Sequence, residues 1–372
     1  MAEYYNSGIG RNKRRRGKKR SGKELTLLIF DILLAVMMAA LLFLSLTIII
    51  CQYVSPINSG FLSVLSLGAP IVYLLDIVVM FYWIVRMRWY LALAMGVMVF
   101  IGLFYLSRYY KLEIDRKYDT SFQERKYVKV MTYNVREGRR EGVVEYIAKH
   151  NPDILCLQEV HVWNPNWTQL EEKYNTTLIK EASATNQILT KYRIIRKGEI
   201  EGMSPQNAVW ADLRIKDDTV RVISLHLQTT AIRLEDTQFL EGHKYILDKE
   251  RSSKLSSIVE RLVENNRKRA VQAEQVSEFM KQSPYRLIVC GDFNDVPLSY
   301  TYRTIAKRLD DAFSEEADGF AYTFNTRYRL LRIDNILVSP ELKVASYEVD
   351  NEVDLSDHYP VVVRLDMAQS SR

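Results

Sequence analysis

The chain contains very little cysteine. Its 372 residues include only Cys51, Cys156 and Cys290. Cys156 and Cys290 each lie within an apolar strand pattern, where cysteine usually behaves as a small buried hydrophobic residue. No Cys/His spacing fits a zinc site. The sequence therefore predicts neither a disulfide framework nor structural zinc.

The C-terminal two thirds of the chain has no excess of positive charge. The first 117 residues hold 15 of the 51 Lys and Arg residues and 6 of the 45 Asp and Glu residues, which leaves 36 against 39 in residues 118–372. Proteins that bind long nucleic acids usually present a basic surface. This balance argues against DNA or RNA as the main ligand.

No internal repeat is evident.

Positive charge is concentrated instead at the N terminus. Residues 1–24 carry nine Lys and Arg residues against Glu3 and Glu24, a local charge of +7. Such a run is usually solvated and disordered, and it can bind nucleic acid. Because an apolar segment follows directly, we interpret residues 1–24 as a basic cytoplasmic arm beside a membrane.

Three apolar runs follow, over residues 25–54, 61–85 and 89–106, with short connections between them. A helix of roughly 20 apolar residues spans a bilayer. Buried helices of a soluble core are the alternative, but three successive runs favour membrane spans. The first run is too long for a cleaved signal peptide. We therefore predict that residues 25–107 form an anchor of three transmembrane helices.

Lysine and arginine favour the cytoplasmic flanks of membrane helices. The basic arm, Arg86 and Arg88 therefore predict a multi-pass protein of the cytoplasmic membrane, with its N terminus inside and its C-terminal domain extracytoplasmic. Arg108 and Lys111 dilute this bias, and an interfacial third segment would reverse the side of the domain. Asp76 in the second span is predicted to be a hydrogen-bonded contact between helices.

A linker over residues 108–125 precedes a domain over residues 126–367, in which strand and helix patterns alternate. This mixture predicts two packed sheets with helices outside. The expected strands cover 127–133, 153–157, 208–215, 220–227 and 287–290, and helical spacing appears over 142–150, 255–263 and 270–281.

Polar residues lie at or near the ends of these strands and of two further ones. Alone, each is usually a cap or a solvated side chain. Together they provide oxygen ligands for a hard divalent cation, a base, and donors for phosphate oxygens, which predicts hydrolysis at phosphorus. The residues are Asn134, Glu159, His226, Asp292, Asn294, Asp334, Asp357 and His358.

Their order along the chain resembles the endonuclease/exonuclease/phosphatase superfamily, above all in the motifs Gly291-Asp292-Phe293-Asn294 and Ser356-Asp357-His358. The resemblance covers about 126–365. It implies a four-layered α/β sandwich whose active site lies at one edge of two facing sheets. It also implies a metal-dependent phosphoesterase.

The resemblance further implies a role for each residue. Mg²⁺ or Mn²⁺ would be held by Glu159 with help from Asp357 and Asn134. His358, oriented by Asp334, would act on water or on the phosphate, and Asp292 would position or deprotonate the nucleophile. Hydrogen bonds to phosphate oxygens would come from Asn294 and His226. Whether His358 or Asp292 is the base stays open.

One departure concerns the residue two positions after Asn134. Some nuclease members carry an acidic residue there, whereas this chain has Arg136. A second acidic ligand is absent at that position. Arg136 either faces phosphate or is a solvated loop residue.

The segment His226-Leu227-Gln228-Thr229 is similar to neutral sphingomyelinases. With the membrane anchor, it favours a phosphodiester of a membrane phospholipid or sphingolipid as the substrate and the lipid bilayer as the partner. An extracytoplasmic DNA or RNA nuclease, a phosphomonoesterase of the same superfamily and a noncatalytic scaffold are the alternatives. The segment between Thr230 and Asn266 is expected to form either a lid or membrane-facing rim, or an amphipathic helix packed on the sandwich.

Overall fold

The computed structural model describes residues 21–111, 127–161, 163–174, 185–230, 249–325, 329 and 331–367. Most of the predicted basic arm, most of the predicted linker and residues 231–248 of the predicted lid lie outside this part of the chain.

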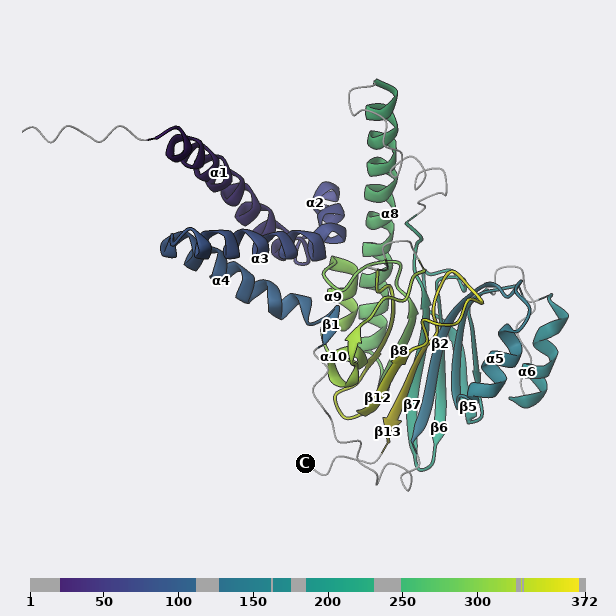
Figure 1. Ribbon diagram of the computed structural model, residues 1–372. Helices are drawn as coiled ribbons and strands as arrows, with labels where there is room; N and C mark the ends of the chain where they lie inside the picture. Colours follow the sequence, from purple (N-terminus) through teal and green to yellow (C-terminus); the bar gives the residue numbers. More distant parts are fainter. Residues whose placement is uncertain are drawn as a thin grey trace, which may run out of the picture.

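Two mixed sheets form the centre of the C-terminal domain (Figure 1). One sheet has the order β5 (Arg193–Glu199), β6 (Ala208–Ile215), β7 (Asp218–His226), β8 (Arg286–Asp292), β11 (Asp334–Val338) and β9 (Asp310–Asp311). The other has the order β12 (Lys343–Val349), β13 (Val361–Asp366), β2 (Val128–Glu137), β3 (Ile154–Val160) and β4 (Gln187–Thr190). Among the strand pairs of the described residues, β2–β3 and β7–β8 alone are parallel. A separate ribbon pairs β1 (Tyr110–Lys111) with β10 (Gly319–Phe320).

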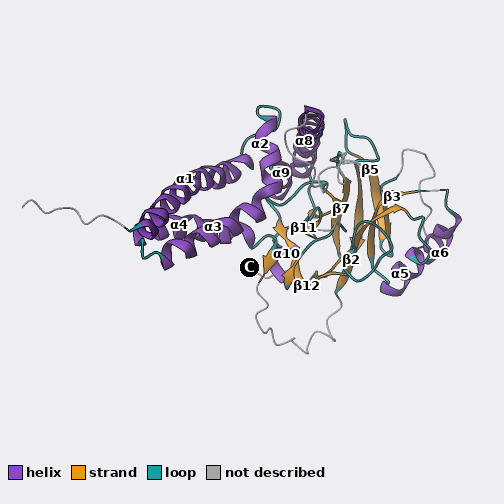
Figure 2. Ribbon diagram, turned by 45° about the horizontal axis from the view of Figure 1, so that its top comes forward, coloured by secondary structure: helices purple, strands orange, loops and turns teal. Residues whose placement is uncertain are grey.

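Helices cover both outer faces of the sheet pair (Figure 2). The five-stranded sheet packs against α5 (Val143–His150) and α6 (Thr168–Lys173), which follows the 3₁₀ turn η3 (Pro165–Trp167). The six-stranded sheet packs against α8 (Lys249–Lys281) and α9 (Tyr300–Ala306). The short helix α10 (Ala312–Glu316) lies between β9 and β10 in the chain. The predicted four-layered α/β sandwich is thus confirmed.

Successive side chains of a strand point to opposite faces of the sheet. The six-stranded sheet therefore contributes side chains to two hydrophobic cores. Val222 and Cys290 face the core between the sheets, whereas Ile223 and Val289 face the layer of α8 and α9. A strand that is buried on both faces has a continuous run of apolar residues in its sequence, as the central strands do here. Cys51, Cys156 and Cys290 are all free and buried.

Three helical segments of the N-terminal region are long and apolar enough to cross a membrane. They project to one side of the sheet pair, away from α5 and α6 (Figure 1). The second predicted span is interrupted by a 3₁₀ turn. The elements are α1 (Gly22–Cys51), α2 (Gly60–Leu65), η1 (Ser66–Gly68), α3 (Ala69–Val85) and α4 (Trp89–Leu106).

Two polar contacts join α1 to α3 and its C-terminal flank. The hydroxyl of Ser45 donates to Oδ2 of Asp76 at 2.6 Å, and both side chains are fully buried. Asp76 is therefore a hydrogen-bonded contact between helices, as predicted. Farther along, both oxygens of Asp31 accept from Arg86, the shorter bond being 2.6 Å. Polar contacts of this kind stabilise helix association in an apolar environment.

Candidate active site

Strand ends from both sheets meet at one edge of the sandwich. Asn134 lies opposite Gln158 where β2 pairs with β3. In the other sheet, Asp292 at the end of β8 lies between His226 of β7 and Asp334 of β11. Because these strands end at the same edge, polar residues far apart in the sequence become neighbours.

Asp292 is at the centre of this cluster and is 1% exposed. Its Oδ1 accepts a hydrogen bond from the backbone N–H of Asn294 at 2.8 Å. Its Oδ2 accepts from Nδ2 of Asn294 at 3.0 Å and from Nδ2 of Asn134 at 3.1 Å. Three donors, one of them from the opposite sheet, therefore fix the carboxylate.

Glu159 and His226 extend the cluster on one side. Oε1 of Glu159 accepts from Nδ2 of Asn134 at 3.0 Å and lies 3.5 Å from Nε2 of His226. The same imidazole nitrogen is 3.9 Å from Oδ2 of Asp292. Among the described residues it is buried without a hydrogen-bond partner. A buried polar atom of this kind is available to a ligand oxygen.

His358 and Asp334 form the other side. Nδ1 of His358 is 2.9 Å from Oδ2 of Asp334, and Nε2 of His358 is 3.7 Å from Oδ2 of Asp292. The backbone N–H of Asp334 donates to Oγ1 of Thr323 at 2.9 Å. The ring of Phe324 packs 4.8 Å from the imidazole. The imidazole is thus held with Nε2 toward the centre of the site.

Asp357 joins the cluster through its neighbours. Its Oδ2 lies 3.2 Å from the guanidinium of Arg136, and Ser356 donates to the backbone oxygen of Asn134 at 2.8 Å. The Asp357 side chain is 31% exposed. The structure therefore brings all eight predicted site residues into one connected cluster.

Backbone strain accompanies the site. Of the eight described non-glycine residues with positive φ angles, three lie in or beside the cluster: Arg136 at 44°, Glu159 at 54° and Asn294 at 52°. Such conformations cost free energy and are enriched at functional sites. Glu159 and Asn294 are both predicted site residues.

A family model described as "Endonuclease/Exonuclease/phosphatase family" matches residues 131–358. The chain belongs to the endonuclease/exonuclease/phosphatase family. A second model, described as "Domain of unknown function (DUF8431)", matches residues 27–109, which contain the three apolar helices. Members of the endonuclease/exonuclease/phosphatase family hydrolyse phosphoester bonds, and so does this enzyme. No curated protein matches the chain in sequence.

Several solved structures are similar to this member of the family. The human Nocturnin catalytic domain with bound sulfate is 19% identical, with a TM-score of 0.46 over 65% of this chain and 95% of that one. An AP endonuclease from Archaeoglobus fulgidus is 18% identical, with a TM-score of 0.46 over 64% and 99%. An endonuclease/exonuclease/phosphatase family protein from Bacteroides thetaiotaomicron is 17% identical, with a TM-score of 0.43 over 65% and 96%.

Two residues of α8 support the site, although the sequence analysis did not identify them. Arg269 donates from one terminal nitrogen to the backbone oxygen of Gln228 at 2.6 Å, and Gln272 accepts from the backbone N–H of Gln228 at 2.8 Å. Nε of the fully buried Arg269 lies 3.6 Å from Oδ2 of Asp295. These contacts hold the chain after His226 against the chain after Asn294. The available signal was polar residues at helical spacing, among them Arg269 and Gln272, in a helix that also carries an apolar face.

Gln158 has a structural role. It is fully buried and hydrogen-bonds to Thr132 and to Ser224 of the opposite sheet, the latter at 3.1 Å. Ser224 in turn donates to Asn186. This buried chain of hydrogen bonds ties the two sheets together just below the site.

The combined effect of burial and nearby charges raises the pKa values of both Asp334 and His358. Burial raises the pKa of Asp334 to about 6, against the opposing positive charge of His358. Burial alone would lower the pKa of His358, but the negative charges of Asp334 and Asp292 raise it to about 10. The pair therefore favours an imidazolium–carboxylate contact at neutral pH.

The family depends on divalent metal ions, and the residues of this chain fit such an ion. Ligand atoms of Asp292, Asp334 and His358 lie within 4.8 Å of one another. Oδ1 of Asp334 is buried and, within the described chain, has no hydrogen-bond partner. With the partly exposed carboxylates of Glu159 and Asp357, this set offers the oxygen atoms and solvent access that Mg²⁺ and Mn²⁺ prefer.

The orientation of Asn134 bears on its predicted place in the metal shell. Its Nδ2 faces Glu159 and Asp292, while its Oδ1 accepts from the backbone N–H of Arg136 at 3.1 Å. In this orientation the amide positions two carboxylates. Direct ligation by its oxygen remains a prediction.

Proposed function

We propose that this enzyme is a membrane-anchored, Mg²⁺- or Mn²⁺-dependent phosphodiesterase that hydrolyses a membrane phospholipid. One observation carries the proposal: the chain immediately after the Asp292–Asn294 motif packs on the apolar N-terminal helices. Neither the family match nor the structures named above single out a sphingolipid, so the proposal is made for phospholipids as a class.

The packing begins two residues after Asn294. Val296 and Leu298 are almost completely buried in a hydrophobic cluster that also contains residues of α1, α3 and α4. Between them, the backbone oxygen of Pro297 accepts from Arg108, two residues after the end of α4, at 3.2 Å. The segment that carries a central site residue is therefore attached to the anchor.

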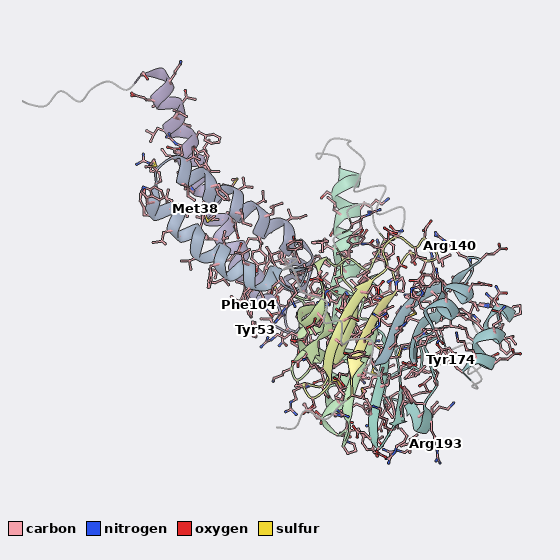
Figure 3. All side chains as sticks on the ribbon, turned by 60° about the horizontal axis from the view of Figure 1, so that its bottom comes forward. Met38, Tyr53, Phe104, Arg140, Tyr174 and Arg193 are labelled. Atoms are coloured by element: carbon pink, nitrogen blue, oxygen red, sulfur yellow. The ribbon has the colours of Figure 1, made fainter. Side chains whose placement is uncertain are left out.

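Further contacts join the same two parts of the molecule. The guanidinium of Arg303 in α9 lies 3.9 Å from the ring centroid of Tyr53, which follows α1. Nδ2 of Asn266 in α8 donates to Ser63 of α2 at 2.7 Å. Figure 3 shows Tyr53 and Phe104 at the junction between the helices and the sheets, with Met38 farther out along the helices. An active site held against membrane helices in this way suits a substrate that resides in the same membrane.

The contacts also agree with the predicted orientation. Tyr53 and Arg108, which follow α1 and α4, contact the catalytic domain, whereas Arg86 at the end of α3 pairs with Asp31 in the N-terminal part of α1. The domain and the Arg86–Arg88 connection therefore belong to opposite ends of the helices. With the basic side in the cytoplasm, the active site is extracytoplasmic.

Each residue receives a role from its position. Glu159 and Asp357 would be the main ligands of the metal ion, which would neutralise charge that develops on the phosphate. Oδ2 of Asp292 lies within 4 Å of both imidazoles, so a water molecule between them can be oriented and deprotonated by Asp292. His358 and His226 donate hydrogen bonds to phosphate oxygens, and Asn294 positions Asp292 while its second amide hydrogen is donated to the backbone oxygen of Leu227.

A substrate panel tests this function. The full-length protein in detergent micelles with Mg²⁺ is assayed on phospholipids, sphingomyelin, single- and double-stranded DNA, RNA and phosphomonoesters. Wild type is expected to release product from phospholipid. The rate for Asp292→Ala is expected to be at least about 100-fold lower. Asp217→Ala is the matched control, because Asp217 is exposed in the turn between β6 and β7. Phospholipid turnover that is equal in wild type and Asp292→Ala would contradict the proposal, as would cleavage of nucleic acid alone.

A further inference from the structure

Beside the cluster, on the side of Asp357, lies a pocket of about 230 Å³. Three arginines, one glutamate, a serine and a leucine line it: Arg136, Arg139, Arg140, Glu137, Ser356 and Leu355. The pocket lies next to the site, because Arg136 contacts Asp357 and Ser356 contacts the backbone of Asn134.

Three guanidinium groups and one carboxylate line the pocket, and Arg136 pairs with Asp357 beside it. Arg139 pairs with Glu137, and Arg140 pairs with Asp354. All four of these side chains are substantially exposed, and exposed ion pairs of this kind are weak. Each guanidinium has five N–H donors, so an ion pair with one carboxylate leaves donors for a ligand.

The size and polarity of the pocket define what it can hold. Pockets that bind drug-sized ligands have volumes of roughly 300–1,000 Å³. The smaller volume here suits a compact group, and the three guanidinium groups of the lining favour an anionic one. Arginine is the preferred residue for phosphate and carboxylate because its planar group donates two parallel hydrogen bonds.

The position of the pocket fits a lipid held at the membrane. Arg140 lies on the far side of the sheets from the junction marked by Tyr53 and Phe104 (Figure 3). The backbone at Arg136 and Glu137 has positive φ angles of 44° and 68°, which turn the chain at the mouth of the site. A lipid bound with its acyl chains toward the anchor would thus extend its head group toward the arginines.

We propose that the pocket formed by Arg136, Arg139 and Arg140 binds a second anionic group on the lipid head group, beyond the phosphate that is hydrolysed. The inference rests on the proposed phospholipid phosphodiesterase activity. It makes the enzyme selective for acidic head groups, such as one that carries an extra carboxylate or phosphate, over zwitterionic ones.

A matched pair of substrates tests the proposal. Dihexanoyl phosphatidylserine and dihexanoyl phosphatidylethanolamine differ by one carboxylate, and kcat/KM for each is measured with full-length protein in the same detergent. Wild type should prefer phosphatidylserine, and the double variant Arg139→Gln/Arg140→Gln should reduce the ratio of the two kcat/KM values about tenfold. The ratio cancels any loss of folded protein that affects both substrates.

Arg193→Gln is the control, because Arg193 is exposed and lies at the opposite end of the sheets (Figure 3). It should leave the ratio unchanged. A wild type without preference, or a double variant with the wild-type ratio, would overturn the role of the pocket while leaving the proposed activity intact. A wild type that hydrolyses neither lipid would contradict the proposed function itself.

Discussion

Nδ2 of Asn134, near the end of β2 in one sheet, lies 3.1 Å from Oδ2 of Asp292, at the end of β8 in the other. The same nitrogen donates to Glu159 at 3.0 Å. A single amide therefore separates two carboxylates and joins the two sheets at the active site.

Asn134→Asp is expected to disrupt this arrangement, because a donor of the same size becomes a third carboxylate. We expect metal-free protein to lose about 1–3 kcal/mol of stability, and activity to fall at least about 100-fold. Thermal unfolding is measured in EDTA and then in Mg²⁺. If repulsion among the three carboxylates causes the loss of stability, a bound cation should restore part of that stability. An unchanged melting temperature in EDTA would show that the amide does not have this role.

Gly291 is required by the close approach of β7 and β8. Its φ is +131°, and a Cβ atom would lie 2.0 Å from the backbone oxygen of Leu225. Gly291→Ala should therefore destabilise the protein by about 3 kcal/mol or more. Gly319→Ala is the control, because Gly319 also has a positive φ but open space around it, so only about 1 kcal/mol is expected. Equal melting temperatures for the two variants would exclude the backbone clash.

The orientation of the domain can be tested by cysteine labelling, since the three native cysteines are buried. Asp217→Cys in the catalytic domain should react with a membrane-impermeant maleimide in sealed right-side-out vesicles. Met87→Cys, at an exposed position between α3 and α4, should react only after permeabilisation. The reverse pattern would place the active site in the cytoplasm.

The contact between Tyr53 and Arg303 should contribute to the coupling of anchor and domain. A double-mutant cycle with Tyr53→Ala and Arg303→Ala is expected to give an interaction free energy of about 0.5–1 kcal/mol. The single variants should also reduce turnover of lipid in bilayers more than turnover of bis(4-nitrophenyl) phosphate. Additive effects on stability would show that the contact is not energetically coupled.

Much of the fold follows from local patterns. The hairpin β6–β7, the strand β8 and the three apolar helices are where apolar alternation and length place them. Helical spacing over 255–263 continues over 270–281, and α8 runs unbroken from Lys249 to Lys281. The polar residues between the two apolar stretches are accommodated because Asn266 and Arg269 bond to Ser63 and Gln228.

The residues of the candidate site could also be predicted from the sequence, because they follow apolar strands whose ends meet. The residues that support the site could not be predicted. Gln272 and Val296 act through contacts with residues that are distant in sequence, and such pairing leaves no local pattern. For Arg136, sequence alone left open both a phosphate-facing and a solvated position. The structure places it between Asp357 and an arginine-lined pocket.

We propose that this protein catalyses metal-dependent attack of water on the phosphorus of a membrane phospholipid. The most direct measurement incubates the full-length protein in phospholipid nanodiscs with Mg²⁺ in H₂¹⁸O and analyses the products by mass spectrometry. We predict one ¹⁸O atom in the phosphorylated product, and loss of turnover with EDTA or in Asp292→Ala. Label in the alcohol product instead, or turnover that survives EDTA, would contradict the account.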